Sequence, residues 1–187
     1  GLKIFGEGEW KVRQHGVGKR RTWRKIHLAV DEAEKDIIGI ELTTADWGDS
    51  EVFPDLLAQV DGEVAQVSAD GAYDTERCHR SIAERGAQAA IPPRDGAVRW
   101  GDNHPRDATL AVIADRGRDG WKEDSGYHQR SLAENMMFRL KQLGDRLFSR
   151  TFERQVAEAH VRVVILNGFT YLGMPRSVRA GQIAPAA

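Results

Sequence analysis

Thr22 to Leu42 reads TWRKIHLAVDEAEKDIIGIEL, a pattern that is typical of a β-hairpin. Between Thr22 and Val30, alternate side chains fall on opposite faces of a strand, with the larger aliphatic residues on one of them. A second run of strand-forming residues, from Ile37 to Leu42, follows the acidic turn that begins at Asp31. The stretch therefore predicts two antiparallel strands joined by a short connection.

The hairpin belongs to a longer series of elements. The turn at Gly16-Val17-Gly18 predicts an earlier strand over Glu9 to Gln14, which makes three antiparallel strands. Helix and strand signals then alternate, with a helix from Ser50 to Val60, a strand from Val64 to Ala69, a helix from Thr75 to Arg85 and a strand from Gln88 to Ile91. This is the element order of an RNase H-like α/β fold with a mixed sheet, although other mixed folds share it.

The remainder of the chain is expected to be an irregular connector followed by helices. Residues 94–126 are rich in Gly, Asp and Arg, and they contain one short helical candidate from Ala108 to Asp115. Amphipathic patterns predict C-terminal covering helices from Tyr127 to Leu143 and from Phe152 to Leu166. We therefore expect one domain over residues 1–175 and a flexible tail over residues 176–187.

Composition narrows the class of protein. The chain has 187 residues, of which 41% are hydrophobic, enough for one substantial core. No apolar run reaches the roughly eighteen residues that cross a membrane, and a secretory signal pattern is absent, so we expect a cytoplasmic protein. Cys78 is the single cysteine, which excludes an internal disulfide, a thiolate zinc cluster and a Cys-x-x-Cys redox pair.

Charge is segregated along the chain although the net charge is −1. Basic residues dominate from Gly1 to His27, whereas acidic residues dominate from Leu28 to Glu76. Both signs of charge are compatible with a protein that holds divalent cations beside a phosphodiester, but solvated surface strands also collect charge. The segregation therefore permits a nucleic-acid partner without establishing one.

One constellation of residues lies on a single predicted helix. Tyr127, Arg130, Glu134 and Lys141 are spaced so that they share one helix face. The opposite face carries Leu132, Met136, Leu140 and Leu143, which predicts an amphipathic helix. An alternative interpretation is a solvated face on which Arg130 and Glu134 form an ordinary i,i+4 ion pair.

Asp70 is the second candidate. It follows the predicted strand from Val64 to Ala69 and precedes Gly71-Ala72-Tyr73, so it lies at the carboxyl end of a strand, where α/β folds place ligand-binding residues. An ordinary turn aspartate, followed by Asp74 as a helix cap, is the structural alternative.

Together the two motifs resemble the catalytic core of DDE transposases of bacterial insertion sequences. The branch with the signature Tyr-x2-Arg-x3-Glu-x6-Lys is matched literally by Tyr127, Arg130, Glu134 and Lys141. The family's second catalytic Asp ends a strand in a motif that Asp70 and Tyr73 match more loosely. The resemblance implies cleavage and strand transfer of DNA element ends, inside a bacterial cell and close to the nucleoid.

The resemblance also implies a metal site. Asp70 and Glu134 would be catalytic and would hold two Mg²⁺ ions, or Mn²⁺ in their place, because hard divalent cations prefer carboxylate oxygens. In this family a first catalytic Asp lies on the first strand, which places it ahead of Gly1, so we expect an N-terminally truncated catalytic domain. Asp31, Asp46 and Asp49 are weaker candidates to replace it, because each also suits a turn or a cap.

DNA contacts are implied for several basic residues. Tyr127 and Arg130 would contact the phosphate beside the scissile bond, and Lys141 would contact a phosphate further along. The predicted basic hairpin supplies further candidates for the DNA backbone, with solvation as the alternative, and these are Arg13, Lys19, Arg20, Arg21 and Arg24. The partners would be double-stranded DNA, as terminal inverted repeats and target, and a second subunit in a homodimeric synaptic complex.

Two other functions remain open from the sequence. An RNase H-like metal-dependent nuclease would hydrolyse DNA without joining it to a target. A truncated transposase remnant would bind DNA without catalysis.

Overall fold

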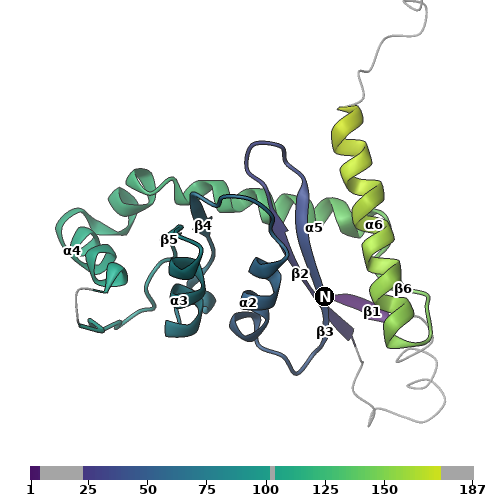
Figure 1. The fold of residues 1–187 in the computed structure, drawn as a ribbon, viewed down its shortest axis with the longest axis horizontal. Helices are drawn as coiled ribbons and strands as arrows, with labels where there is room; N and C mark the ends of the chain where they lie inside the picture. The colour runs from purple at the N-terminus through teal and green to yellow at the C-terminus, as the bar shows by residue number, and fades with distance from the viewer. Residues whose placement is uncertain (5–22, 102–103, 174–187) are drawn as a thin grey trace, which may run out of the picture.

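A four-stranded sheet in the order β3-β2-β1-β6 organises one part of the fold in the computed structural model, which describes residues 1–4, 23–101 and 104–173 (Figure 1). Its strands are β1 (Leu2–Ile4), β2 (Trp23–Val30), β3 (Ile37–Thr44) and β6 (Arg146–Leu147). β2 pairs antiparallel with β3 from Arg24 opposite Thr44, with an irregular register at the end near Val30. β1 runs antiparallel to β2 and parallel to β6. The hairpin predicted from the sequence is confirmed, whereas the earlier strand expected over residues 9–14 lies outside the described residues.

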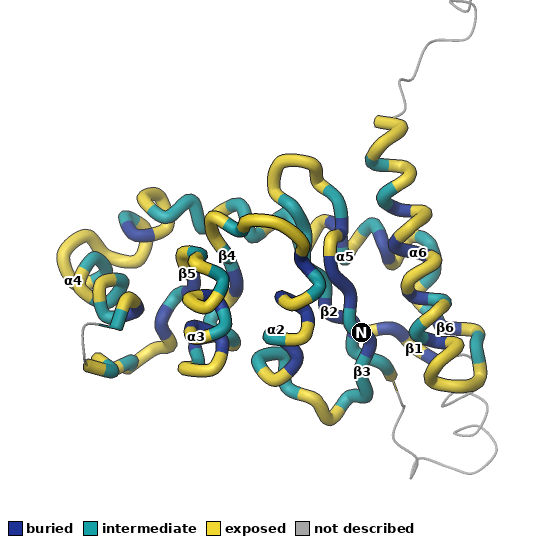
Figure 2. Tube along the Cα trace, in the orientation of Figure 1, coloured by how far each residue is buried: buried dark blue, intermediate teal, exposed yellow. Residues whose placement is uncertain are grey.

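Helices α5 (Ser131–Gln142) and α6 (Phe152–Leu172) complete this part and share its core. Leu2, Leu140 and Leu147 are fully buried where sheet and helices meet. Met136 is also buried, and Leu132 and Leu143 are partly buried, so the predicted apolar stripe of α5 is confirmed. α6 extends beyond the predicted end at Leu166, and its last turns are exposed (Figure 2).

A second cluster of elements has a core of its own. Strands β4 (Gln66–Ser68) and β5 (Gln88–Ala90) pair in parallel, and α3 (Glu76–Glu84) connects them. Helix α2 (Asp49–Ala58) contacts α3 as well as β2 and β3, so it links the two parts. The second core consists of Phe53, Leu57, Ala69, Cys78, Ile82 and Ile91.

The described strands form a mixed α/β structure but not the single mixed sheet that the element order predicts. β4 pairs with β5, and β1 has β2 and β6 as its neighbours. Local patterns correctly predict where most strands occur. They do not encode which strands are neighbours, because pairing depends on contacts between distant segments.

The predicted connector over residues 94–126 is right in part: the short helical candidate from Ala108 to Asp115 lies within a helix, but that helix is longer than predicted. α4 (Pro105–Asp124) is a helix whose course is interrupted at Gly117, with φ of 73° and ψ of 171°. His104 caps the N-terminus of α4, since its ring accepts a hydrogen bond from the backbone N–H of Arg106. Pro105 occupies the first turn, where a helix tolerates proline. Glycines and charges in its second half, from Arg116 to Asp124, are why the sequence pattern predicts only the first part of this helix.

Candidate functional site

A cavity of about 1220 Å³ lies between β2, α2, β4 and α5. This exceeds the roughly 300–1,000 Å³ of most ligand pockets. Six of the candidate residues from the sequence line it, namely Asp31, Asp49, Asp70, Arg130, Glu134 and Lys141, and His27 and Tyr73 line it as well. Asp70 and Glu134, which are far apart in the sequence, therefore lie on the walls of one cavity.

Asp70 lies two residues after the end of β4 and caps a short 3-10 helix, η1 (Gly71–Tyr73). Its Oδ1 accepts a hydrogen bond from the backbone N–H of Ala72 at 2.9 Å. The side chain is exposed toward the cavity. The turn role that was the alternative from sequence therefore exists, and it leaves the carboxylate at the cavity wall.

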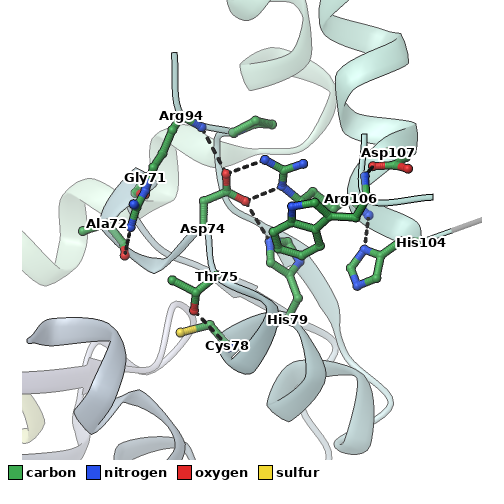
Figure 3. A network of polar contacts seen from close by, with 12 residues as sticks. Gly71, Ala72, Asp74, Thr75, Cys78, His79, Arg94, His104, Arg106 and Asp107 are labelled. Atoms are coloured by element: carbon green, nitrogen blue, oxygen red, sulfur yellow. Dashed lines mark hydrogen bonds and ion pairs between the residues drawn. The ribbon is translucent and has the colours of Figure 1, made fainter. Parts of the chain in front are cut away.

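Arg94 fixes the turn that carries Asp70. Its Nε donates to the carbonyl of Gly71 and its Nη2 to the carbonyl of Ala72, both at 3.1 Å. Its backbone N–H donates to Asp74 Oδ2 at 3.1 Å (Figure 3). The segment after β5 thus holds the segment after β4 in place.

Asp74 is the centre of a buried polar network that the sequence analysis missed. Arg106 donates to both of its carboxylate oxygens, at 2.6 and 2.8 Å, and His79 Nε2 lies 3.3 Å from Oδ1 (Figure 3). The cap of α3 is Thr75, whose hydroxyl accepts from the N–H of Cys78, so the alternative cap at Asp74 is wrong. Nothing in the local pattern connects position 74 with position 106.

Electrostatics in this network favour a charged Asp74 and a neutral His79. Burial alone would raise the pKa of Asp74, but the hydrogen bonds from Arg106 and from the Arg94 backbone outweigh it and lower that pKa. Burial lowers the pKa of His79, and the neighbouring Asp74 offsets this only in part. Trp100 packs over the Arg106 guanidinium at 4.1 Å and closes the network against solvent.

Tyr127 and Arg130 belong to a 3-10 turn, η2 (Tyr127–Arg130), that leads into α5. The single α-helix expected from Tyr127 to Leu143 is therefore wrong at its start. Residues three apart still share a face in a 3-10 turn, and the Arg130 guanidinium carbon lies 5.6 Å from the Tyr127 ring centroid. Tyr127 also packs against Trp121, with ring centroids 5.2 Å apart.

Tyr127 lies beside the cavity rather than in its lining. Burial raises the pKa of its hydroxyl, and Asp70 adds to this, whereas Arg130 opposes it. Arg130, Glu134 and Lys141 do line the cavity. Three of the four signature side chains therefore line the cavity. The fourth, Tyr127, lies outside the lining with its ring next to the Arg130 guanidinium.

Arg130 and Glu134 form an ion pair of 2.8 Å. The Glu134 side chain is 62% exposed, so solvent screens the pair. The i,i+4 pair that was the structural alternative is therefore present. Its exposure allows the Glu134 carboxylate to exchange this partner for another cation at little cost.

The donor set fits a hard divalent cation in part. Asp70 and Glu134 supply carboxylate oxygens of the kind that Mg²⁺ prefers. Within residues 1–4, 23–101 and 104–173, no group of three His, Cys, Asp or Glu side chains is placed to hold a metal ion. Asp31 and Asp49, the weaker candidates for the family's first catalytic Asp, line the cavity without completing such a group, and Asp46 is not in its lining.

Five basic residues ahead of the helix signature were expected to contact DNA, and Arg24 is the one among them that the structure describes. Its Nε donates to Gln155 Oε1 at 2.8 Å, and its guanidinium lies over the Phe152 ring. Arg24 thus joins β2 to α6. The other four, Arg13, Lys19, Arg20 and Arg21, lie outside the described residues. Among the described helices, none is long and apolar enough to cross a membrane.

Comparison with known proteins gives one family match. The family model described as "Transposase DDE domain" matches residues 1–167. No solved structure matches the chain significantly. The match covers nearly all of the described residues, including the whole cavity.

Proposed function

Because the chain belongs to the transposase DDE-domain family, we propose that it is the catalytic domain of an insertion-sequence transposase, in which Asp70 and Glu134 hold divalent cations. Its reaction would be metal-dependent cleavage and strand transfer of element ends. The observation that carries the proposal is that these two acids line one cavity together with Arg130 and Lys141. Carboxylates that would hold divalent metal ions, next to positively charged side chains that would bind phosphate, suit phosphodiester chemistry.

Each side chain has a role that its position supports. Asp70 and Glu134 would each present carboxylate oxygens to Mg²⁺ or Mn²⁺, which when bound activates the attacking oxygen and stabilises the leaving one. Arg130 would leave Glu134 for the DNA phosphate, which its planar fork binds through two hydrogen bonds. Lys141 would contact a second phosphate as a mobile charge. Tyr127 would help to position Arg130 through the contact between its ring and the Arg130 guanidinium.

The complete metal site would take one more carboxylate besides those of Asp70 and Glu134, as the family resemblance implies. An RNase H-like sheet and a homodimer that pairs two element ends are parts of the same proposal. A catalytically inactive DNA-binding remnant is the second candidate, favoured by the lack of a three-acid cluster among the described residues.

The proposal is tested by joining a pre-cut element end to target DNA in Mg²⁺ or Mn²⁺. The protein should join the strands, whereas Asp70→Asn and Glu134→Gln should not. Glu84→Gln is the matched control, because Glu84 is an exposed acid on α3 away from the cavity. Hydrolysis without joining would support a nuclease instead, and DNA binding with neither product would support the remnant.

A further inference from the structure

The outer face of α6 is hydrophobic although it is exposed. Between residues 157 and 171, every side chain within an arc of about 120° on this helix is hydrophobic or is a glycine. These residues, called the outer α6 face below, are all exposed, and they are Ala157, Val161, Val164, Ile165, Gly168 and Tyr171. An exposed face without a charged side chain over about four turns is unusual for a surface helix and is typical of an interaction surface.

The outer α6 face has the spacing of a helix that packs against another helix. Ala157, Val161, Val164, Gly168 and Tyr171 are separated by four, three, four and three residues, which is the spacing of the contact positions in paired helices. The opposite side of α6 is already used, since it packs on β3, α5 and β6. Figure 1 shows that the last turns of α6 project beyond the other described elements. A further helix therefore has access to this face.

The charge distribution favours an apolar partner. Between residues 157 and 171, Glu158 and Arg162 are the only charged side chains. They pair with each other, and their side chains are only 19% and 8% exposed. DNA or an anionic membrane surface would require free cations beside the hydrophobic residues. The outer α6 face therefore matches a second hydrophobic helix better than it matches a nucleic acid or a lipid surface.

Gly168 has no packing role within one copy of the chain. A Cβ atom added there would have no described atom within 4 Å outside the backbone of α6. Glycine in a helix interior is destabilising relative to alanine, because it has more backbone freedom to lose. A partner that approaches the backbone closely at this position would explain the glycine.

An antiparallel pair of α6 helices matches large residues with small ones. When the two-fold axis lies level with position 166, Val164 of each copy is opposite Gly168 of the other, and Val161 is opposite Tyr171. A parallel pair would instead place Gly168 opposite Gly168 and leave a gap, which costs packing contacts. The helix dipoles also oppose each other favourably in the antiparallel arrangement.

We propose that two copies of this chain associate through their outer α6 faces, with the α6 helices antiparallel about a two-fold axis level with position 166. The partner is thus a second copy of the same chain. This identifies the surface of the homodimer in the proposed function, and it rests on that function for the role of the dimer, which is to hold two element ends together. Self-association is measured without DNA, so its failure is distinguishable from a failure of strand joining.

The exposed area is sufficient for a reversible dimer. The exposed parts of Val161, Val164, Ile165 and Tyr171, with the flanking Phe169, amount to roughly 600–1,100 Å² over two copies. This lies at the low end of specific interfaces, before any contact outside α6 is counted. We therefore expect a dimer with a dissociation constant in the micromolar range rather than a permanent one.

The first test is sedimentation equilibrium of the 187-residue protein without DNA. The wild-type chain should form dimers at micromolar concentrations. Val164→Glu should weaken them about tenfold or more, because it places two like charges close to the axis. Val98→Glu is the matched control, since Val98 lies in the segment before α4 and is 74% exposed, close to the 71% of Val164, and it should leave dimerisation unchanged.

A wild-type protein that stays monomeric throughout this range would overturn the proposal. Equal dimerisation by Val164→Glu would also overturn it, because the copies would then meet elsewhere. Vesicles of phosphatidylglycerol and phosphatidylcholine provide a further comparison. Binding of a monomeric wild-type chain to them would identify a membrane surface in place of a dimer interface.

Gly168→Gln separates association from folding. Glutamine is a better helix former than glycine, and the position has free space within one copy, so the thermal midpoint measured on the dilute monomer should stay the same or rise. Dimerisation should nevertheless weaken about tenfold, since the new side chain occupies the space of the partner's Val164. Unweakened dimerisation would contradict the assigned contact.

Disulfide cross-linking tests the antiparallel direction. Val161→Cys and Tyr171→Cys should each fail to cross-link alone, because two copies of either position would lie about 15 Å apart along the helices and a disulfide requires Cα atoms about 4.4–6.8 Å apart. A mixture of the two variants should cross-link. The native Cys78 is fully buried and should not interfere. Cross-linking of each variant with itself, or none in the mixture, would refute the arrangement.

Discussion

Asp74 and Arg106 form a two-pronged ion pair in which the side chains are only 1% and 3% exposed. The pair joins the turn after β4 to the start of α4, across 32 residues of sequence. A buried pair of this kind contributes little net stability over apolar residues, but removing one partner leaves an uncompensated buried charge. The pair therefore determines where the α4 segment sits relative to the Asp70 turn.

Arg106→Met is predicted to lower the free energy of unfolding by about 3–5 kcal/mol, because it leaves the buried Asp74 carboxylate without its positively charged partner. Urea denaturation measures the change. Arg116→Met is the matched control, since Arg116 forms an exposed ion pair with Asp124, and it should cost at most about 1 kcal/mol. Equal effects of the two substitutions would contradict the assigned role of Arg106.

Stability should fall as the pH is lowered below 6.5, the ordinary pKa of histidine. Burial lowers the folded-state pKa of both His27 and His79, so the unfolded chain binds protons that the folded chain does not. Stability therefore decreases with falling pH wherever the unfolded state holds more protons. The free energy of unfolding measured between pH 7.5 and about 5 should show this slope.

The double variant His27→Gln, His79→Gln should flatten that slope. His160→Gln, which replaces an exposed histidine, should leave it unchanged. An unchanged slope in the double variant would assign the pH dependence to other groups.

A further loss of stability is expected in acid. The folded-state pKa of Asp74 is lowered from its ordinary value of 3.8, so its contribution is present above that value and is lost as the pH falls through the folded-state pKa. Asp74→Asn should therefore reduce the stability difference between pH 5 and roughly pH 2. Acid titrations of both proteins, followed by circular dichroism, would reveal the difference, and identical curves would refute it.

Leu140→Ala is predicted to destabilise the protein by about 2–5 kcal/mol. Leu140 is completely buried between α5, α6 and the sheet, so truncation leaves a cavity in the core. Leu172→Ala is the control, because Leu172 is 78% exposed, and it should change stability by less than about 0.5 kcal/mol. A small effect at position 140 would mean that α5 does not pack as described.

Arg130→Lys separates stability from function. The Arg130–Glu134 pair is largely exposed, so its loss should cost at most about 0.5 kcal/mol of stability. Strand joining should decrease by about tenfold or more, since lysine cannot form the two-pronged phosphate contact. Wild-type joining by this variant would remove Arg130 from the proposed DNA site.

Local sequence patterns were sufficient for the elements that depend on neighbouring residues. The hairpin from Trp23 to Thr44, the α3 helix with its stop at Gly86, and the apolar stripe of α5 all follow from spacing and turn chemistry. The fixed spacing of Glu134 and Lys141 likewise predicted the helix that carries both of them, whereas Arg130 lies in the 3-10 turn before it. The transposase family was suggested by the resemblance of these motifs to its signature, and the match of the family model over residues 1–167 confirms the family.

Only the tertiary structure brought the distant segments together. It placed Asp70 and Glu134 on one cavity, paired β6 with β1, and buried Asp74 against Arg106. It also placed residues 26–30 of β2 and residues 66–68 of β4 in the lining of the same cavity. Periodicity and capping report interactions over a few residues, whereas these contacts join segments that are distant in sequence and are selected by the packing of the whole chain.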